Sequence, residues 1–205
     1  MEGKPRSSGC GFVRFDALTA KYKQAKKEEG LEETLAAELT AQGWQVTRQA
    51  YCRPMNEGWR RIDIYAVGYV DGYTSSKAPV AIGIELKDKS DARDFRKAYA
   101  QIRRYREAAV WCTPEGEMLA PPSWLAYTSR YLLGGTKHGT APDFLVERFM
   151  WDCGASTLRR NWDGNLEMTM RVPRFCKGPK HPILTTADWT FQLTYWKTDR
   201  KVGEQ

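Results

Sequence analysis

Two segments near the middle of the chain alternate apolar and polar residues and are therefore predicted to be β-strands. In the first segment, R-R-I-D-I-Y, Ile62 and Ile64 are expected on one face and Asp63 on the other. In the second segment, I-G-I-E-L-K, the polar face carries Glu85 and Lys87. A turn-rich stretch separates the two segments. If they pair as a hairpin, two carboxylates and one ammonium converge on one face of the sheet.

Helical patterns flank these strands. Upstream, residues 16–42 follow a helical period, which Gly30 is expected to divide or to end. Leucines at every fourth position then form one stripe until Gly43 stops the helix. Residues 44–52 alternate and are predicted to form a strand. Downstream, apolar residues at helical spacing predict a long helix over about residues 91–110, with basic residues between them.

The last third of the chain has mixed signals. The stretch W-L-A-Y-T-S-R-Y-L-L fits a strand or a short helix, and the stretch that begins at Pro142 is typical of a helix. A hairpin is predicted to turn at Asp163 and Gly164, and a late strand is predicted over residues 189–196. This order of elements predicts an α/β or α+β fold with a small mixed central sheet, flanking helices and a β-rich C-terminal extension.

The same pattern divides the chain into three parts. Residues 1–15 are rich in Gly, Ser and basic residues without a clear period, and we expect them to be flexible. Residues 16–135 form the predicted core. Residues 136–205 form an extension that we expect to pack on the core within a single overall domain.

Composition narrows the classes of function. The 205-residue chain is 41% hydrophobic with a net charge of +7, which favours a polyanionic partner, nucleic acid before a membrane surface. Seven basic residues against two acidic ones fall between Lys89 and Arg106, directly after the Glu85 strand. The sequence has no apolar stretch long enough to span a membrane, so no membrane partner is expected. Five scattered cysteines without a framework spacing favour a reducing cytoplasm, that of a host cell if the protein is viral.

The polar face of the two strands carries the groups that metal-assisted phosphodiester hydrolysis needs. Asp63 and Glu85 offer hard oxygen ligands suited to Mg²⁺ or Mn²⁺, and the carbonyl of Leu86 could join them. A bound cation makes a water more acidic. Lys87 could orient or deprotonate that water and stabilise the negative charge that develops on the phosphorus centre.

These residues resemble the PD-(D/E)XK nuclease superfamily, in which an acidic residue on one strand precedes Glu-x-Lys at the end of the next. Asp63 and Glu85-Leu86-Lys87 match that pattern, although Ile62 stands where the pattern has proline. The resemblance covers roughly residues 30–110. It implies a restriction-endonuclease-like core, a divalent metal site and a DNA partner.

The downstream helix extends the resemblance. Gln101-Ile-Arg-Arg-Tyr105 is similar to the Q-x-x-x-Y helix motif of RecB-type nucleases and of type I restriction subunits. Gln101 and Tyr105 lie at positions i and i+4, so they face the same way. In the family that face looks toward the metal site and the DNA backbone, and Arg103 and Arg104 are further candidates for backbone contacts.

Many family members also take an acid from an upstream helix. Glu32 is our candidate to assist a metal or the attacking water, because it borders the leucine stripe. Glu38, on the other border of that stripe, is the rival candidate.

The sequence therefore predicts a metal-dependent deoxyribonuclease that hydrolyses DNA phosphodiester bonds. The alternative is a catalytically inactive nuclease-like fold that acts as a nucleic-acid-binding or assembly module, which the unplaced, aromatic-rich last third keeps open. A solvated strand face with cross-strand ion pairs is the simpler explanation of the three charged strand residues. Most tryptophans are expected to pack in or beside the core, and Trp59, beside Arg60 and Arg61, is the candidate for stacking on unpaired bases.

Overall fold

The computed structural model describes residues 27–55, 57–68, 79–88, 92–134, 149–161, 164–177 and 182–192. The elements follow in the order α2 (Lys27–Ala41), β1 (Gln45–Pro54), β2 (Arg60–Gly68), β3 (Val80–Lys87), α3 (Ala92–Arg106), β4 (Ala108–Cys112), β5 (Met118–Leu119), β6 (Trp124–Ser129), α4 (Arg130–Leu133), β7 (Ser156–Arg160), β8 (Leu166–Lys177) and β9 (Pro182–Gln192). The protein is thus a mixture of helices and strands, as its sequence predicts.

One sheet organises these elements. Its nine strands lie in the order β5-β4-β1-β2-β3-β6-β7-β8-β9. Strands β3 and β6, and β6 and β7, pair in parallel, whereas the other neighbours are antiparallel. A parallel pair needs a long crossover connection, which α3, β4 and β5 provide between β3 and β6. The sheet is therefore mixed, as predicted, but larger than the small sheet that we expected.

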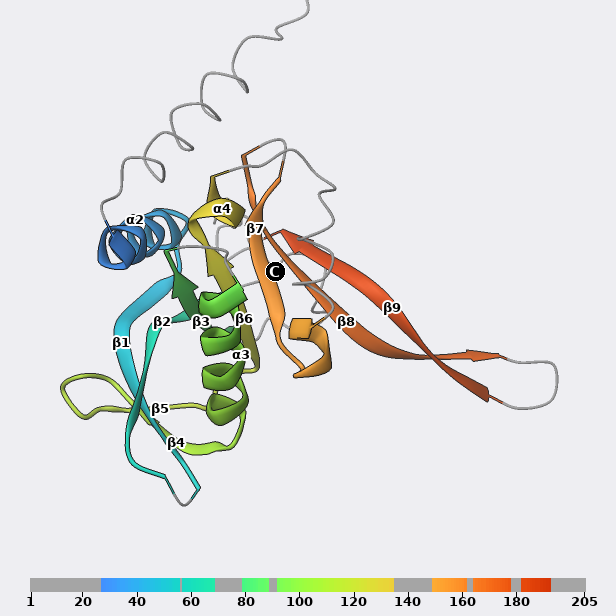
Figure 1. Ribbon diagram of the computed structural model, residues 1–205, viewed down its shortest axis with the longest axis horizontal. Coiled ribbons are helices and arrows are strands. Elements are labelled where there is room, and N and C mark those ends of the chain that lie inside the picture. The colour runs from blue at the N-terminus through green and yellow to red at the C-terminus, as the bar shows by residue number, and fades with distance from the viewer. Residues whose placement is uncertain are drawn as a thin grey trace, which may run out of the picture.

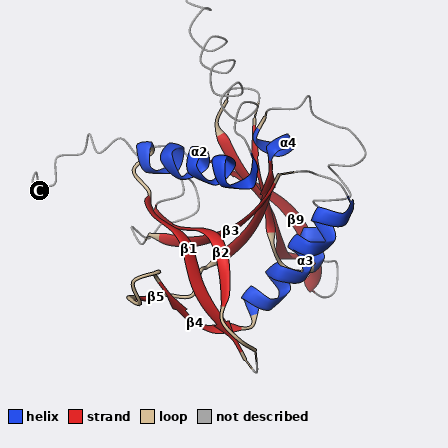
Figure 2. Ribbon diagram, turned by 60° about the vertical axis from the view of Figure 1, so that its left-hand side comes forward, coloured by secondary structure: helices blue, strands red, loops and turns tan. Residues whose placement is uncertain are grey.

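Two helices cover the sheet on different sides, as Figure 2 shows. On the α2 side, Leu31, Leu35 and Leu39 are fully buried in a cluster that includes residues of β2, β3 and β6. On the α3 side, Ala98 and Ile102 pack in a second cluster with β1, β2 and β6. Burying one leucine side chain stabilises a fold by about 1.5–3 kcal/mol. The predicted leucine stripe is confirmed and fixes α2 against the sheet.

The C-terminal part continues the same sheet. Strands β7 and β8 form the predicted hairpin, and Gly164 has the positive φ of 81° that its turn requires, while Asp163 lies outside the described residues. Strands β8 and β9 pair over their whole length and extend away from the helices as a two-stranded ribbon (Figure 1). Strand β9 starts at Pro182, seven residues before the predicted start at 189, and residues 193–196 lie outside the described part.

Several boundaries differ from the prediction. Gly30 lies inside α2 and does not divide it, and α3 ends at Arg106. Residues 108–110, the end of the predicted helix, instead belong to β4, because this strand pairs with the end of β1. The ambiguous stretch after residue 123 contains both a strand and a short helix. The expected flexible segment 1–15, the helical period before residue 27, and most of the helix predicted from Pro142 lie outside the described residues.

The expectation that Ile62 and Ile64 share one face is wrong. Ile64 belongs to the cluster under α2, whereas Ile62 belongs to the cluster under α3. Ile62 packs so closely over Gly83 that a Cβ on that glycine would come within 2.8 Å of Ile62 Cδ1. The alternation of β2 therefore changes phase at Asp63. The opposite residue of β1, Gln49, has a φ of 56°, so the two strands are distorted at the same place.

Candidate metal and active site

Asp63 lies where β2 and β3 part. The backbone pairing of the two strands ends at Ile64 and Ile84. Beyond that pair, Asp63 Oδ2 accepts a hydrogen bond of 2.7 Å from the backbone N–H of Leu86. The Asp63 carboxylate therefore accepts a hydrogen bond that a backbone carbonyl would accept in a regular ladder. This contact places the carboxylate against the end of β3. The sequence predicts this convergence, although the strands approach through a side chain instead of a regular hairpin.

Glu85 faces α3 and is 1% exposed. Its Oε2 atom lies 2.9 Å from the hydroxyl oxygen of Tyr105, which also lies 2.8 Å from the carbonyl oxygen of Arg61. Gln101 Nε2 approaches the same hydroxyl at 3.4 Å. Gln101 and Tyr105 thus face the same way, and Tyr105 reaches the predicted carboxylate directly. This contact links α3, β2 and β3 at one point.

Lys87 is the centre of the ion pairs at this site. Its Nζ atom lies 2.5 Å from Glu85 Oε1, 2.9 Å from the carbonyl oxygen of Leu86 and 3.0 Å from Glu28 Oε1. These three acceptors match the three donors of an ammonium group. Burial lowers the pKa of Lys87, but the charge and hydrogen bond of Glu85, with Asp63 and Glu28, outweigh burial and raise it. Lys87 therefore remains protonated and is not a general base in this arrangement.

Burial raises the pKa of both strand carboxyl groups above its ordinary value. Burial, followed by the charge of Glu85, raises the pKa of Asp63 from 3.8 to about 8, although the Leu86 N–H lowers it. Burial also raises the pKa of Glu85, against the opposing effects of Lys87 and Tyr105. Two partly desolvated carboxyl groups that disfavour their own ionisation gain most from a nearby positive charge. Lys87 supplies such a charge to Glu85, and a cation beside Asp63 would favour the ionised form of both groups.

Two carboxyl groups suit a cation that keeps several bound waters, such as Mg²⁺, better than a cation that protein ligands enclose completely. Across the described ranges, no group of three or more His, Cys, Asp or Glu side chains is arranged to hold a metal ion. Mg²⁺ is usually held by one or two carboxylates, with water and substrate phosphates in its remaining positions. Asp63 and Glu85, joined through the Leu86 backbone, supply such a pair. The oxygen atoms of these two side chains are ligands of the kind that Mg²⁺ or Mn²⁺ takes.

A different helix acid from the two that we predicted contacts Lys87. Glu28, in the first turn of α2, forms the 3.0 Å ion pair with Lys87. Glu32 is 4% exposed and accepts hydrogen bonds from Arg48 Nε, at 2.7 Å, and from Gln49 Nε2.

Glu38 lies outside the site, because it pairs with the buried Arg160 of β7 at 2.5 Å. Glu28 was not among the predicted candidates, because Gly30, two residues later, was expected to divide or end the helix and so to separate Glu28 from Glu32. In a continuous helix Glu28 is one turn before Glu32, and this i, i+4 spacing was the available signal.

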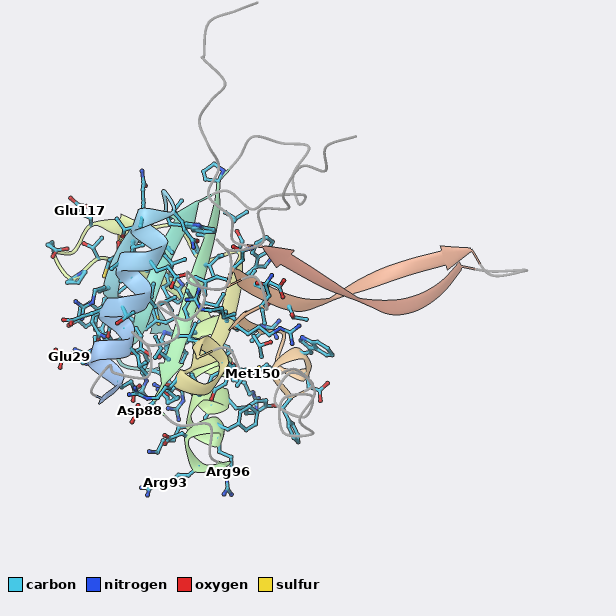
Figure 3. All side chains as sticks on the ribbon, turned by 90° about the horizontal axis from the view of Figure 1, so that it is seen from above. Glu29, Asp88, Arg93, Arg96, Glu117 and Met150 are labelled. Atoms are coloured by element: carbon cyan, nitrogen blue, oxygen red, sulfur yellow. The ribbon has the colours of Figure 1, made fainter. Side chains whose placement is uncertain are left out.

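Helix α3 carries several exposed basic residues. In Figure 3, Asp88, the residue that directly follows β3, lies toward the same edge of the molecule as Arg93 and Arg96. The predicted backbone contacts Arg103 and Arg104 are both exposed, and Arg104 lies 3.5 Å from Glu57 of the turn between β1 and β2. The basic face of α3 is therefore exposed, while Tyr105, which contacts Glu85, lies on the buried face of the same helix.

Comparison with family models, curated proteins and solved structures finds no match to this chain. Within the described residues, no helix is both long and apolar enough to cross a membrane.

Proposed function

We propose that this protein is a metal-dependent deoxyribonuclease with a restriction-endonuclease-like core of the PD-(D/E)XK type. The proposal depends on one observation: Asp63, Glu85 and Lys87 converge where the pairing of β2 and β3 ends. Tyr105 forms a hydrogen bond with Glu85 at the same place. The succession of α2, three antiparallel strands, α3 and a parallel β6 supports the same proposal. A solvated strand face is disfavoured, since Glu85 and Lys87 are buried.

In this proposal each residue has a role that follows from its contacts. Asp63 and Glu85 hold Mg²⁺, which when bound polarises a phosphate oxygen and makes a water more acidic. Lys87 stays protonated and stabilises the negative charge that develops on the phosphate in the transition state. Glu28 holds the Lys87 ammonium, and Tyr105 fixes the orientation of Glu85.

The basic face of α3 supplies contacts to the DNA backbone. Exposed arginine and lysine side chains neutralise phosphates, and such contacts carry little information about sequence. The exposed basic residues of this helix are Arg93, Arg96, Lys97, Arg103, Arg104 and Arg106. We therefore propose that α3 positions the backbone, while Gln101 and Tyr105 support the site from the inner side of the same helix.

Cleavage of DNA of different topologies tests this proposal. Purified protein is incubated with circular, linear and single-stranded DNA in Mg²⁺ or Mn²⁺, and products are resolved by electrophoresis. We expect wild-type cleavage, and loss of cleavage in Asp63→Ala and in Lys87→Ala. Glu33→Gln is the matched control, because Glu33 is an exposed carboxylate of α2 that lies 3.4 Å from Arg48. No cleavage of any DNA, or equal cleavage by Asp63→Ala and wild type, refutes the proposal.

One observation favours an inactive DNA-binding module as the second candidate. Both carboxylate oxygens of Glu85 already have partners, Lys87 and Tyr105, and all three donors of Lys87 have acceptors. A module of this kind would bind DNA with a steep salt dependence. It would show no cation binding that depends on Glu85. Calorimetric titration of Mg²⁺ into wild type and Glu85→Gln separates the two candidates.

A further inference from the structure

A residue of β1 that no sequence pattern singles out lies opposite Asp63. Among the described residues, Gln49 is the one non-glycine residue with a positive φ, 56°. This left-handed conformation is unfavourable for any residue that has a Cβ. Such strain persists where surrounding contacts impose it, and it concentrates at functional sites. The backbone of Gln49 therefore suggests that its side chain has a function.

The ladder between β1 and β2 is interrupted at the same position. Gln49 and Asp63 are directly opposite in the antiparallel register, yet they do not form a ladder pair. Directly opposite residues of antiparallel strands are close neighbours. The strained residue is therefore the nearest neighbour of Asp63 on β1. The pairs on either side are intact: Arg48 with Ile64, and Ala50 with Ile62.

The left-handed backbone also redirects the Gln49 side chain. Successive side chains of a strand normally point to opposite faces, yet Arg48 and Gln49 both donate hydrogen bonds to Glu32. The amide nitrogen of Gln49 is thus committed to Glu32. Its amide oxygen Oε1 is buried and has no hydrogen-bond partner in the part of the chain that the structure describes. A buried acceptor of this kind requires a partner.

We propose that Gln49 is a positioning residue of the cation site. Its Nε2 atom holds Glu32, and its Oε1 atom accepts a hydrogen bond from a water in the hydration shell of the cation beside Asp63. The inference rests on the proposed function, because it requires a divalent cation at Asp63 and Glu85. It explains why a non-glycine residue keeps a left-handed backbone here: that backbone brings the amide to the side of Glu32.

Three variants test this role. Gln49→Met removes the amide and keeps a side chain of similar length. Gln49→Gly removes the side chain and suits the left-handed backbone. Gln42→Met is the matched control, because Gln42 Oε1 is also buried without a hydrogen-bond partner among the described residues. Gln42 follows the last turn of α2, about 20 Å along the helix from Glu28 at 1.5 Å per residue.

The readouts are calorimetric Mn²⁺ affinity without DNA and the melting temperature in EDTA. We expect both Gln49 variants to bind Mn²⁺ about two- to tenfold more weakly, the effect of one lost hydrogen bond, and Gln42→Met to match wild type. Gln49→Gly should keep the wild-type melting temperature in EDTA, since relief of strain offsets its lost bond to Glu32.

Three results overturn the inference, and they are distinguishable. Wild-type affinity in both Gln49 variants, together with lost binding in Asp63→Asn, refutes the role of Gln49 and leaves the metal site intact. Equal weakening in Gln42→Met and Gln49→Met also refutes a specific role. An absence of Mn²⁺ binding by the wild type refutes the inference and the proposed metal site together.

Discussion

Replacing Asp63 with asparagine is predicted to stabilise the cation-free protein increasingly as the pH rises. The folded protein holds the Asp63 proton with a pKa of about 8, compared with an ordinary value of 3.8. A group with a raised pKa in the folded state contributes its full stability below its unfolded pKa and loses it as the pH rises through the folded pKa. Asparagine has the shape of the protonated acid and does not ionise. The variant therefore escapes this loss.

The magnitude follows from the shift. One pKa unit corresponds to about 1.4 kcal/mol. A shift of about four units therefore makes the stability difference between Asp63→Asn and wild type change by as much as about 6 kcal/mol between pH 4 and pH 9. The change favours the variant at the alkaline end. Saturating Mg²⁺ at pH 9 should narrow the gap, because a ligand that binds the folded state stabilises only the protein with the intact site.

The assay is urea unfolding of both proteins in EDTA at several pH values, repeated with Mg²⁺ at the highest pH. The free energy of unfolding is extrapolated to water for each condition. A difference between the two proteins that stays constant from pH 4 to pH 9, or that favours wild type at alkaline pH in EDTA, refutes the electrostatic description of Asp63.

Three further predictions test the surroundings of the site. Trp59 is 51% exposed, and Trp59→Ala should weaken binding of single-stranded DNA, measured by fluorescence anisotropy, by about five- to hundredfold, the effect of one stacked base. Trp59→Phe should keep most of the affinity, and equal losses in the two variants contradict stacking. Arg160→Met removes the partner of Glu38 and should lower the free energy of unfolding by about 3–5 kcal/mol without a change in calorimetric Mg²⁺ affinity; a weaker affinity contradicts the separation of this pair from the site. Gly83→Ala should cost about 1–3 kcal/mol in urea unfolding through overpacking against Ile62, and an unchanged midpoint contradicts the position of Ile62.

Local periodicity accounts for what the sequence predicts well. The buried apolar face of β3 and the leucine stripe of α2 depend on spacing within one element, which a sequence shows directly. The i, i+4 relation of Gln101 and Tyr105 is likewise a property of a single helix, and the structure places both at one hydroxyl contact. The candidate residues on β3 and α3 could therefore be selected before their positions were known.

Tertiary contacts decide the features that the sequence does not predict. The end of α3 and the start of β4 depend on pairing with β1, because the buried Ala108 and Trp111 are three residues apart, a spacing that by itself fits a helix. The change of phase at Asp63 lies opposite the distorted backbone of Gln49, and no local sequence pattern predicts a positive φ at a glutamine. The contact of Glu28 with Lys87 joins residues 59 positions apart.

The central claim is that Asp63, Glu85 and Lys87 form a metal-dependent site that cuts DNA. The most direct test compares the initial rate of plasmid cleavage in Mg²⁺ by wild type with that of Glu85→Gln, at equal concentrations of folded protein. Our account predicts cleavage by wild type that EDTA abolishes, and a rate at least about a hundredfold lower in Glu85→Gln, the scale on which one transition-state contact acts. Equal rates in the two proteins, or wild-type cleavage that persists in EDTA, would contradict it.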